Sequence, residues 1–331
     1  MTLQKVTIKL GLWVAVGGLA GWGGLKVSTR LPEGAVGPSS ATSGDEEPAV
    51  EATLQRHVKR LAANIGERND HHPIELQSAC DYVQEQFLRA GLRTSIDRYA
   101  IGGSLGNVIA EIDEPRRGRE ILLISAAYDS PVGSPGAQQS ATAVAAALEL
   151  ARLLANGGHP RAVRFLVHAY GHQPMEDGSS GRRFSLRRME SRGDPIQLEL
   201  QLDTLGAWRG GYPQNLPFPW NTILPARSDY LFLCGGFDAR EPLLDLANRL
   251  RSGGRVPVEG IAGPAFWPGI GFSDRVALLD QGAPIIVVGD TGHWRHAAAG
   301  GPQDEPESID YAGMARAVVA LAEAIGPRLE L

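Results

Sequence analysis

The apolar positions of this chain fall into two patterns, short continuous runs and longer stretches with helical spacing. Residues 120–125 (EILLIS) form a near-continuous apolar run, which is typical of a strand buried on both faces. Apolar and polar residues alternate at 94–99 and 107–112, which also predicts strands. We predict further buried strands at 163–167, 198–202, 231–234 and 285–288.

Between these strands the apolar residues recur three and four positions apart, which indicates amphipathic helices. One helix starts near Pro73, because proline is favoured in the first turn, and it stops at Gly91. Other helices are predicted at 54–65, 140–154, 241–250 and 311–325. This alternation predicts a three-layer αβα domain with a mixed, mainly parallel central sheet. In such α/β folds the functional side chains follow the carboxyl ends of the strands.

The N-terminal segment follows neither pattern. Lys5 and Lys9 precede an uncharged stretch at 10–25, which is shorter than the roughly 20 residues that span a bilayer and well sized for the core of an export signal. We expect residues 1–27 to be a signal-anchor that holds the domain on the periplasmic or extracellular side of a membrane. The alternative is a signal that is cleaved to release a secreted protein. Residues 28–52 are rich in Pro, Gly, Ser and acidic residues and predict a flexible linker, followed by a folded domain at 53–331.

Composition narrows the choice of partners. The formal net charge of -5 gives no reason to expect binding to nucleic acid. Cys80 and Cys234 are the only cysteines, too few for a disulfide scaffold or a zinc–thiolate site. We predict that both are buried free thiols, with a disulfide between them as the alternative.

The loop after the apolar run at 120–125 reads SAAYDSPVGSPGAQQSATAV, residues 125–144. It resembles a segment of the zinc metallopeptidase family of bacterial aminopeptidases, glutamate carboxypeptidase and glutaminyl cyclase, the twenty-eighth metallopeptidase family. That family typically carries Gly-Ala-His-Tyr-Asp-Ser and then Pro-Gly-Ala-x-Asp-Asn-Ala-Ser-Gly-Val. The similarity runs without rearrangement from IGERN at 65–69 and GNVIAEI at 106–112 to GDT at 289–291. The resemblance therefore implies a zinc-aminopeptidase-like fold.

The resemblance also implies a particular active site. Family members hold two zinc ions with five side chains, and a glutamate acts as general base for the zinc-bound water. The first histidine ligand falls at Ala127, the bridging aspartate at Gln139 and the last histidine at Gly300. Asp203 matches the fourth ligand, and Asp129 matches the aspartate that orients the first histidine. Asp203 is therefore the only ligand position that keeps a metal-binding side chain.

The paired glutamates of the family fall in Tyr-Gly-His-Gln-Pro, residues 170–174. They align with His172 and Gln173 when the proline is the anchor, and with Gly171 and His172 when no gap is allowed after the preceding strand. Neither alignment contains a carboxylate, so the general base is missing. The candidates for a catalytic role at family positions are His172, Gln173 and Asp129.

A single carboxylate cannot hold zinc usefully, because metal affinity depends on the number, charge and geometry of the ligands. We therefore predict no zinc cofactor and a catalytically inactive domain, a pseudopeptidase. The transferrin receptor and nicastrin are precedents, since both resemble the family without peptidase activity. The expected role is that of a binding or scaffold protein at the cell envelope, with a peptide-like ligand or a protein partner in the former cleft.

Two alternatives keep an enzymatic function. One is an active metallo-aminopeptidase with a reorganised zinc site built from His172, Asp203 and either His293 or His296. The other is a metal-free hydrolase that uses His172 and a serine. Against both, we favour a hydrogen-bonded loop histidine at 172 and a solvated polar loop around Asp290, His293 and His296.

A run of five arginines follows the residues that align with the glutamate pair. The run would suit an acidic ligand, but a solvated helix face is the usual reason for such a pattern. Its members are Arg182, Arg183, Arg187, Arg188 and Arg192.

Overall fold

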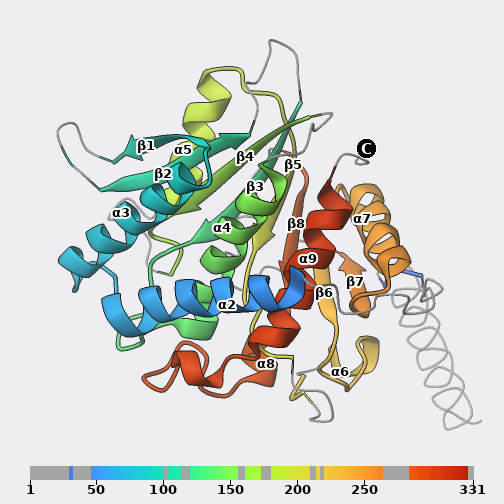
Figure 1. The fold of residues 1–331 in the computed structure, drawn as a ribbon. Helices are drawn as coiled ribbons and strands as arrows, with labels where there is room; N and C mark the ends of the chain where they lie inside the picture. The colour runs from blue at the N-terminus through green and yellow to red at the C-terminus, as the bar shows by residue number, and fades with distance from the viewer. Residues whose placement is uncertain are drawn as a thin grey trace, which may run out of the picture.

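The computed structural model describes residues 30–32, 46–99, 103, 105–112, 120–155, 161–172, 180–208, 214–216, 220–263 and 283–326. Within these residues an eight-stranded sheet has the order β1-β2-β4-β3-β5-β8-β6-β7 (Figure 1). The strands β3, β4, β5 and β8 run parallel. At one side β2 runs antiparallel to both β4 and β1, and at the other side β6 runs antiparallel to β8 and parallel to β7. The strands are β1 (Arg93–Arg98), β2 (Gly106–Ile112), β3 (Ile121–Ala127), β4 (Ala162–His168), β5 (Ile196–Leu202), β6 (Leu231–Gly235), β7 (Val258–Ala262) and β8 (Ile285–Gly289).

Helices cover both faces of this sheet (Figure 1). On one face α3 packs on β1 and β2, α4 on β3, β4 and β5, and α7 on β6 and β7, while α2 lies against α4 and α9. On the opposite face α5 packs on β2 and β4. The helices are α2 (Glu46–Val58), α3 (Pro73–Arg89), α4 (Thr142–Leu154), α5 (Gly181–Ser191), α6 (Trp220–Ile223), α7 (Arg240–Gly253), α8 (Gly292–Arg295) and α9 (Tyr311–Ile325), with short helical turns η1 (Lys59–Ile65), η2 (Ala137–Ala141) and η4 (Pro306–Ser308). The predicted αβα fold with a mixed sheet is confirmed.

Strand β3 shows why the central apolar runs are so continuous. Leu122 and Ile124 point into the large core beneath α4, whereas Leu123 points into a smaller cluster with Leu166 and Met189 beneath α5. Because helices cover both faces of the strand, the side chains that point to either face are shielded from solvent. The run at 120–125 is therefore a strand buried on both faces, as the sequence predicted.

The folded domain begins earlier than the sequence predicted. Helix α2 starts at Glu46, and its Val50 and Leu54 are completely buried, so the boundary at residue 52 is wrong. The predicted helix at 54–65 is the end of α2 followed by η1. Residues 30–32 also contact the domain, as argued below, so they are not part of a free linker.

The expected signal-anchor at 1–27 lies outside the described residues. Among the residues that are described, no helix is both long enough and apolar enough to cross a membrane. Cys80 and Cys234 do lie in the described part, and both are buried free thiols as predicted. Burial raises the pKa of the Cys80 thiol, which makes this cysteine unreactive.

Candidate functional site

The candidate site lies where the parallel strands end. Ala127 closes β3, the segment after β4 carries His172, and Asp203 follows β5 directly. The turn η2 brings Gln139 to this edge, and Gly300 comes from the segment after α8. The carboxyl ends of neighbouring parallel strands meet at one edge of a sheet, so most of the sequence-predicted positions are assembled together.

Asp129 is a buried carboxylate whose two oxygens are both in use. Oδ1 accepts a hydrogen bond from the backbone N–H of Gly171 at 2.9 Å, and Oδ2 accepts one from the backbone N–H of His172, also at 2.9 Å. Burial alone would raise the pKa of Asp129, but the His172 charge and these hydrogen bonds outweigh it and hold the pKa below its usual value. Asp129 therefore fixes the backbone after β4.

His172 lies against this carboxylate. Its Nδ1 is 3.6 Å from Oδ2 of Asp129, and its side chain is 9% exposed. Burial acts to lower the pKa of His172, but the charges of Asp129 and Asp203 outweigh it and raise the pKa. Neither ring nitrogen has a hydrogen-bond partner among the described residues. His172 is thus hydrogen-bonded to Asp129 through its backbone N–H, and its ring lies in a buried contact with the same carboxylate.

Ala127 and Gly171 are in direct contact. A Cβ atom on Gly171 would lie 2.5 Å from the Cβ of Ala127 and 3.3 Å from Oδ1 of Asp129. Position 171 is therefore confined to glycine as long as Ala127 and the present backbone stay in place. No local sequence pattern indicates this contact, because Ala127 ends β3 whereas Gly171 lies in the segment after β4.

Gln139 and Gly300 also lie side by side. A Cβ atom on Gly300 would be 3.5 Å from Oε1 of Gln139. The buried carboxylate of Asp304 holds the two segments together, since it accepts the backbone N–H groups of Gln138 at 2.7 Å, Gln139 at 3.0 Å and Gly300 at 3.0 Å. Gly300 has a φ of 75°, a backbone angle that residues other than glycine rarely adopt. Asp304 belongs to no recognisable motif, so nothing in the sequence marks it as part of the site.

The donor set does not fit a pair of zinc ions. Ala127 and Gly300 offer no donor atom, Gln139 offers a neutral amide, and both oxygens of Asp129 already accept backbone N–H groups. Within the described part of the chain no three His, Cys, Asp or Glu side chains are grouped so that they could share a metal ion. Asp203, which is 3% exposed, is thus a family ligand position without the other ligands around it.

Asp290 follows β8 and is committed to a different task. Its carboxylate accepts hydrogen bonds from Thr204 Oγ1 at 2.7 Å, Gln138 Nε2 at 2.9 Å and the backbone N–H of Ala207 at 2.6 Å. These donors satisfy a buried carboxylate without a metal ion. Asp290 therefore ties the ends of β5 and β8 to η2.

The loop that starts at Asp290 packs against the domain, and Asp290 is completely buried, which corrects the prediction of a solvated loop for this residue. Arg295 donates to the backbone oxygens of Ala207 and Tyr230, and its guanidinium lies 4.5 Å from the centre of the Tyr230 ring. His296 is partly buried. The side chain of His293 and the whole of Gln173 lie outside the described residues, so the reorganised zinc site remains only a prediction.

Two residues at this edge have unusual backbone conformations. Tyr170 has a φ of 57° and Thr291 a φ of 58°. Such angles are uncommon for residues other than glycine and are outliers for a β-branched residue such as threonine. Tyr170 comes two residues after β4 ends and Thr291 two residues after β8, so both lie beside the candidate site. Strain of this kind often gathers at functional sites.

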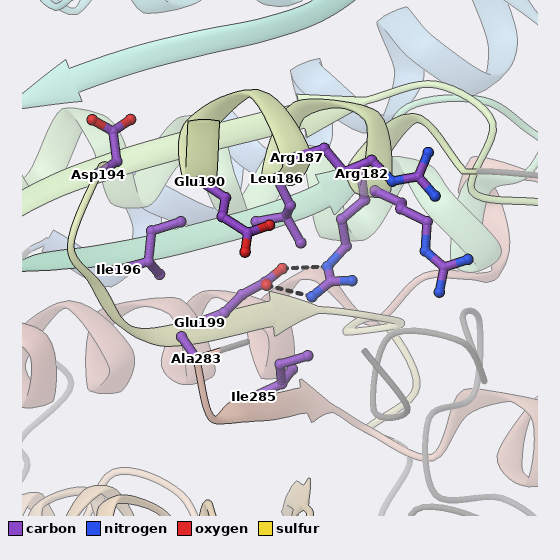
Figure 2. A pocket seen from close by; sticks show the side chains of 10 residues that line it. Arg182, Leu186, Arg187, Glu190, Asp194, Ile196, Glu199, Ala283 and Ile285 are labelled. Carbon is purple, nitrogen blue, oxygen red and sulfur yellow. Dashed lines mark hydrogen bonds and ion pairs between the residues drawn. The ribbon is translucent and has the colours of Figure 1, made fainter. Parts of the chain in front are cut away.

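The arginine run leads to a separate pocket of about 410 Å³ between α5 and the strands β5 and β8 (Figure 2). Arg182 is 1% exposed and forms two hydrogen bonds with Glu199, at 2.7 and 2.5 Å. Ser125 Oγ donates to the same carboxylate at 2.5 Å. The interpretation as a solvated helix face is therefore wrong for Arg182, although it holds for the exposed Arg187. This pocket contains none of the residues that align with the family's metal ligands.

Comparison with known proteins agrees with this geometry. Residues 107–213 match the model of Peptidase family M28. An uncharacterised protein of Escherichia coli (strain K12), YfbL, is 29% identical over 280 residues, which are 80% of this chain and 84% of YfbL. The crystal structure of the LapA aminopeptidase of Legionella pneumophila has a TM-score of 0.65 at 16% identity and covers 91% of this chain and 79% of its own. A glutaminyl cyclase of Bacteroides thetaiotaomicron has a TM-score of 0.60 at 14% identity and covers 83% of this chain and 97% of its own.

These matches confirm the resemblance to the M28 family and the aminopeptidase-like fold. At such low identity the structural similarity describes the fold and not the reaction. What this chain does must therefore be argued from its own site.

Proposed function

We propose that this M28-like peptidase domain is a pseudopeptidase, which has kept the fold of the family and lost its zinc chemistry. Its role in this proposal is to bind a peptide-like ligand or a protein partner at the cell envelope. The fold, the loop order and the position of Asp203 support a common design with the aminopeptidases. The side chains at the other positions that align with metal ligands argue against a shared zinc-dependent reaction.

One observation carries the proposal, the contact between Ala127 and Gly171. In the alignment with the family, position 127 carries the first zinc ligand, and position 171 is one of the two places where the first glutamate of the pair can fall. A Cβ atom on Gly171 would lie 2.5 Å from that of Ala127, well inside the distance at which carbon atoms repel. Position 171 therefore has no room for a glutamate side chain beside Ala127 in the present backbone.

The charges of the site add support. Asp129 and Asp203 are 2% and 3% exposed, and buried carboxylates need compensating positive charge or hydrogen bonds. Arg68 is completely buried and interacts electrostatically with Asp129. Its guanidinium donates to the backbone oxygens of Tyr128 at 2.6 Å and Pro135 at 2.6 Å. Arg68 and the neighbouring His172 thus balance these acids with side chains alone.

The location at the cell envelope is part of the proposal. Its support is the uncharged stretch at 10–25, preceded by Lys5 and Lys9. We propose that this stretch stays attached as a signal-anchor and places the domain outside the cytoplasm. Cleavage after the stretch would instead give a secreted protein.

The proposal is tested by zinc content and activity of the full chain, purified in detergent and dialysed against zinc. Bound zinc is measured by elemental analysis, and hydrolysis is measured on a panel of aminoacyl-p-nitroanilides. Cyclisation of N-terminal glutamine is assayed in parallel, because glutaminyl cyclases share the fold. The matched variant is Asp203→Asn, which removes the one carboxylate at a family ligand position with little change in shape.

We expect less than one zinc ion per chain, no turnover above the blank, and the same zinc reading for Asp203→Asn. One or two zinc ions per chain that are lost in Asp203→Asn, with chelator-sensitive hydrolysis, would overturn the proposal in favour of an active metallopeptidase. Hydrolysis that resists chelators and disappears in His172→Gln would overturn it in favour of a metal-free hydrolase.

A further inference from the structure

The segment Arg30–Pro32 docks on the edge strand of the sheet. Its Leu31 backbone N–H donates to the carbonyl of Gly260 at 3.0 Å, and Arg30 forms an antiparallel bridge with Ile261. In Figure 1 this segment is the short blue stretch beside β7 and α7, far in sequence from either element. Strand β7 is the last strand of the sheet within the described residues, and this segment covers its outer edge at this point.

The docking site is shaped for this segment. Leu31 is 3% exposed and belongs to the main core. A Cβ atom on Gly260 would lie 2.4 Å from Cδ1 of Leu31. The binding site for the Leu31 side chain, called the Leu31 seat below, therefore exists because β7 has a glycine at position 260. Leu31 is therefore held by the packing of its side chain as well as by the hydrogen bond of its backbone N–H.

Polar contacts fix both neighbours of Leu31. Arg30 forms an ion pair with Glu259 at 3.1 Å, in which both side chains are largely buried. Arg251 of α7 donates to the carbonyl oxygen of Pro32 at 2.9 Å. Three consecutive residues are thus bound to β7 and α7 by different kinds of contact, which defines their position in a way that a flexible linker would not.

We infer that this docking holds the domain against a membrane by its β7–α7 side, with the lipid surface as the partner of that side. The inference rests on the proposed attachment through residues 10–25. It goes beyond attachment alone, because a domain on a flexible linker could take any orientation relative to the membrane, whereas the docked domain could take only a restricted range. The docked segment is the reason, since it lies only a few residues after the apolar stretch ends.

Chain length sets the magnitude of this restriction. From Leu25 to Arg30 there are five peptide steps, which span at most about 18 Å at about 3.6 Å each. A flexible linker over residues 28–52 would have a root-mean-square span of about 28 Å and a much longer maximum. Strands are spaced about 4.8 Å apart, so the β1 edge, seven strands from β7, is about 34 Å away. The reach of the attachment is therefore shorter than the sheet is wide.

The experiment compares two matched labels on the full chain in phosphatidylcholine vesicles that contain a nitroxide-labelled lipid. Ser252→Cys places a fluorophore at the exposed end of α7, and Ser95→Cys places it on the exposed face of β1. The wild-type chain serves as the labelling blank, because Cys80 and Cys234 are buried. We expect nitroxide quenching to be several-fold stronger at position 252 than at position 95.

A second variant separates docking from folding. A Gly/Ser insertion of about 20 residues between Val27 and Ser28 adds a root-mean-square reach of about 25 Å and leaves the Leu31 seat untouched. We expect the difference between the two labels to shrink in this variant.

Equal quenching at both positions in the uninserted chain would overturn the inference, as would a chain that does not float with the vesicles. A difference that survives the insertion unchanged would also overturn it. Zinc content and peptidase activity do not enter these measurements. Failure of the orientation and failure of the pseudopeptidase proposal are therefore seen separately.

Discussion

The contact between Ala127 and Gly171 leads to a prediction about the stability of the site. Gly171→Ala places a Cβ atom 2.5 Å from the Cβ of Ala127, and both atoms are attached directly to the backbone, so neither can rotate away. Overpacking of this kind costs about 1–3 kcal/mol of unfolding free energy. The variant should therefore be less stable than the wild type by that amount.

Ala127→Gly tests whether the contact is the cause. This change alone should cost about 1 kcal/mol, because glycine loses more backbone freedom on folding than alanine does. If the two costs simply added, the double variant would lose about 2–4 kcal/mol. Since Ala127→Gly removes the atom that clashes, we expect the double variant to lose only about 1–2 kcal/mol.

The assay is urea unfolding of all four proteins, followed by tryptophan fluorescence and far-ultraviolet circular dichroism. The unfolding free energy comes from linear extrapolation, and equal slopes for the four proteins show that the change lies in stability. Gly253→Ala is the matched control. A Cβ atom there meets only a side-chain oxygen of Glu323, at 3.9 Å, so no clash is expected.

Additivity of the two changes within about 0.5 kcal/mol would refute the reasoning. It would mean that the backbone at the ends of β3 and β4 yields easily to a larger side chain. A glutamate at position 171 could then be accommodated, and the pseudopeptidase proposal would lose its main support.

Three further predictions concern other parts of the molecule. Burial, and to a smaller extent the charge of Arg56, lower the pKa of His57 to about 4, so the unfolded chain binds a proton at a higher pH than the folded chain does. The unfolding free energy should therefore be at its full value above pH 6.5 and fall by up to about 3 kcal/mol as the pH drops toward 4. Urea titrations of His57→Gln should show a much smaller loss. Arg182→Met should lower the unfolding free energy by about 3–5 kcal/mol, because it leaves the Glu199 carboxylate buried without its cation. Adding Glu199→Gln should recover most of this loss, and a small effect of Arg182→Met alone would contradict the reasoning. Gly300→Ala should cost about 1 kcal/mol by thermal unfolding because of the positive φ at this position. An equal loss in the control Gly253→Ala, where a new Cβ atom meets only a side-chain oxygen at 3.9 Å, would count against that cause.

The fold was largely readable from the sequence because burial selects residue types locally. The run at 120–125 predicted a buried strand, and the spacing between Pro73 and Gly91 predicted α3, since each pattern follows from the covered faces of one element. The strand β7 was missed. Its five residues include Gly260 and Glu259, so it has no apolar run to mark it. Helix α2 was cut short because its first residues are acidic and the segment before them is polar.

The sequence alone also determined which chemical groups the site lacks, because a donor atom is a property of the residue type. The side chains of Ala127 and Gly300 have no donor atom for zinc, and Gln139 offers only a neutral amide in place of a carboxylate. Which groups meet is a different matter, since it depends on strands that are distant in the chain. The contact of Ala127 with Gly171, the three backbone hydrogen bonds to Asp304, and the seat of Leu31 against Gly260 arise only when the sheet has formed. The tertiary structure decided these features because they depend on distances between separate elements, and a linear pattern carries no such distances.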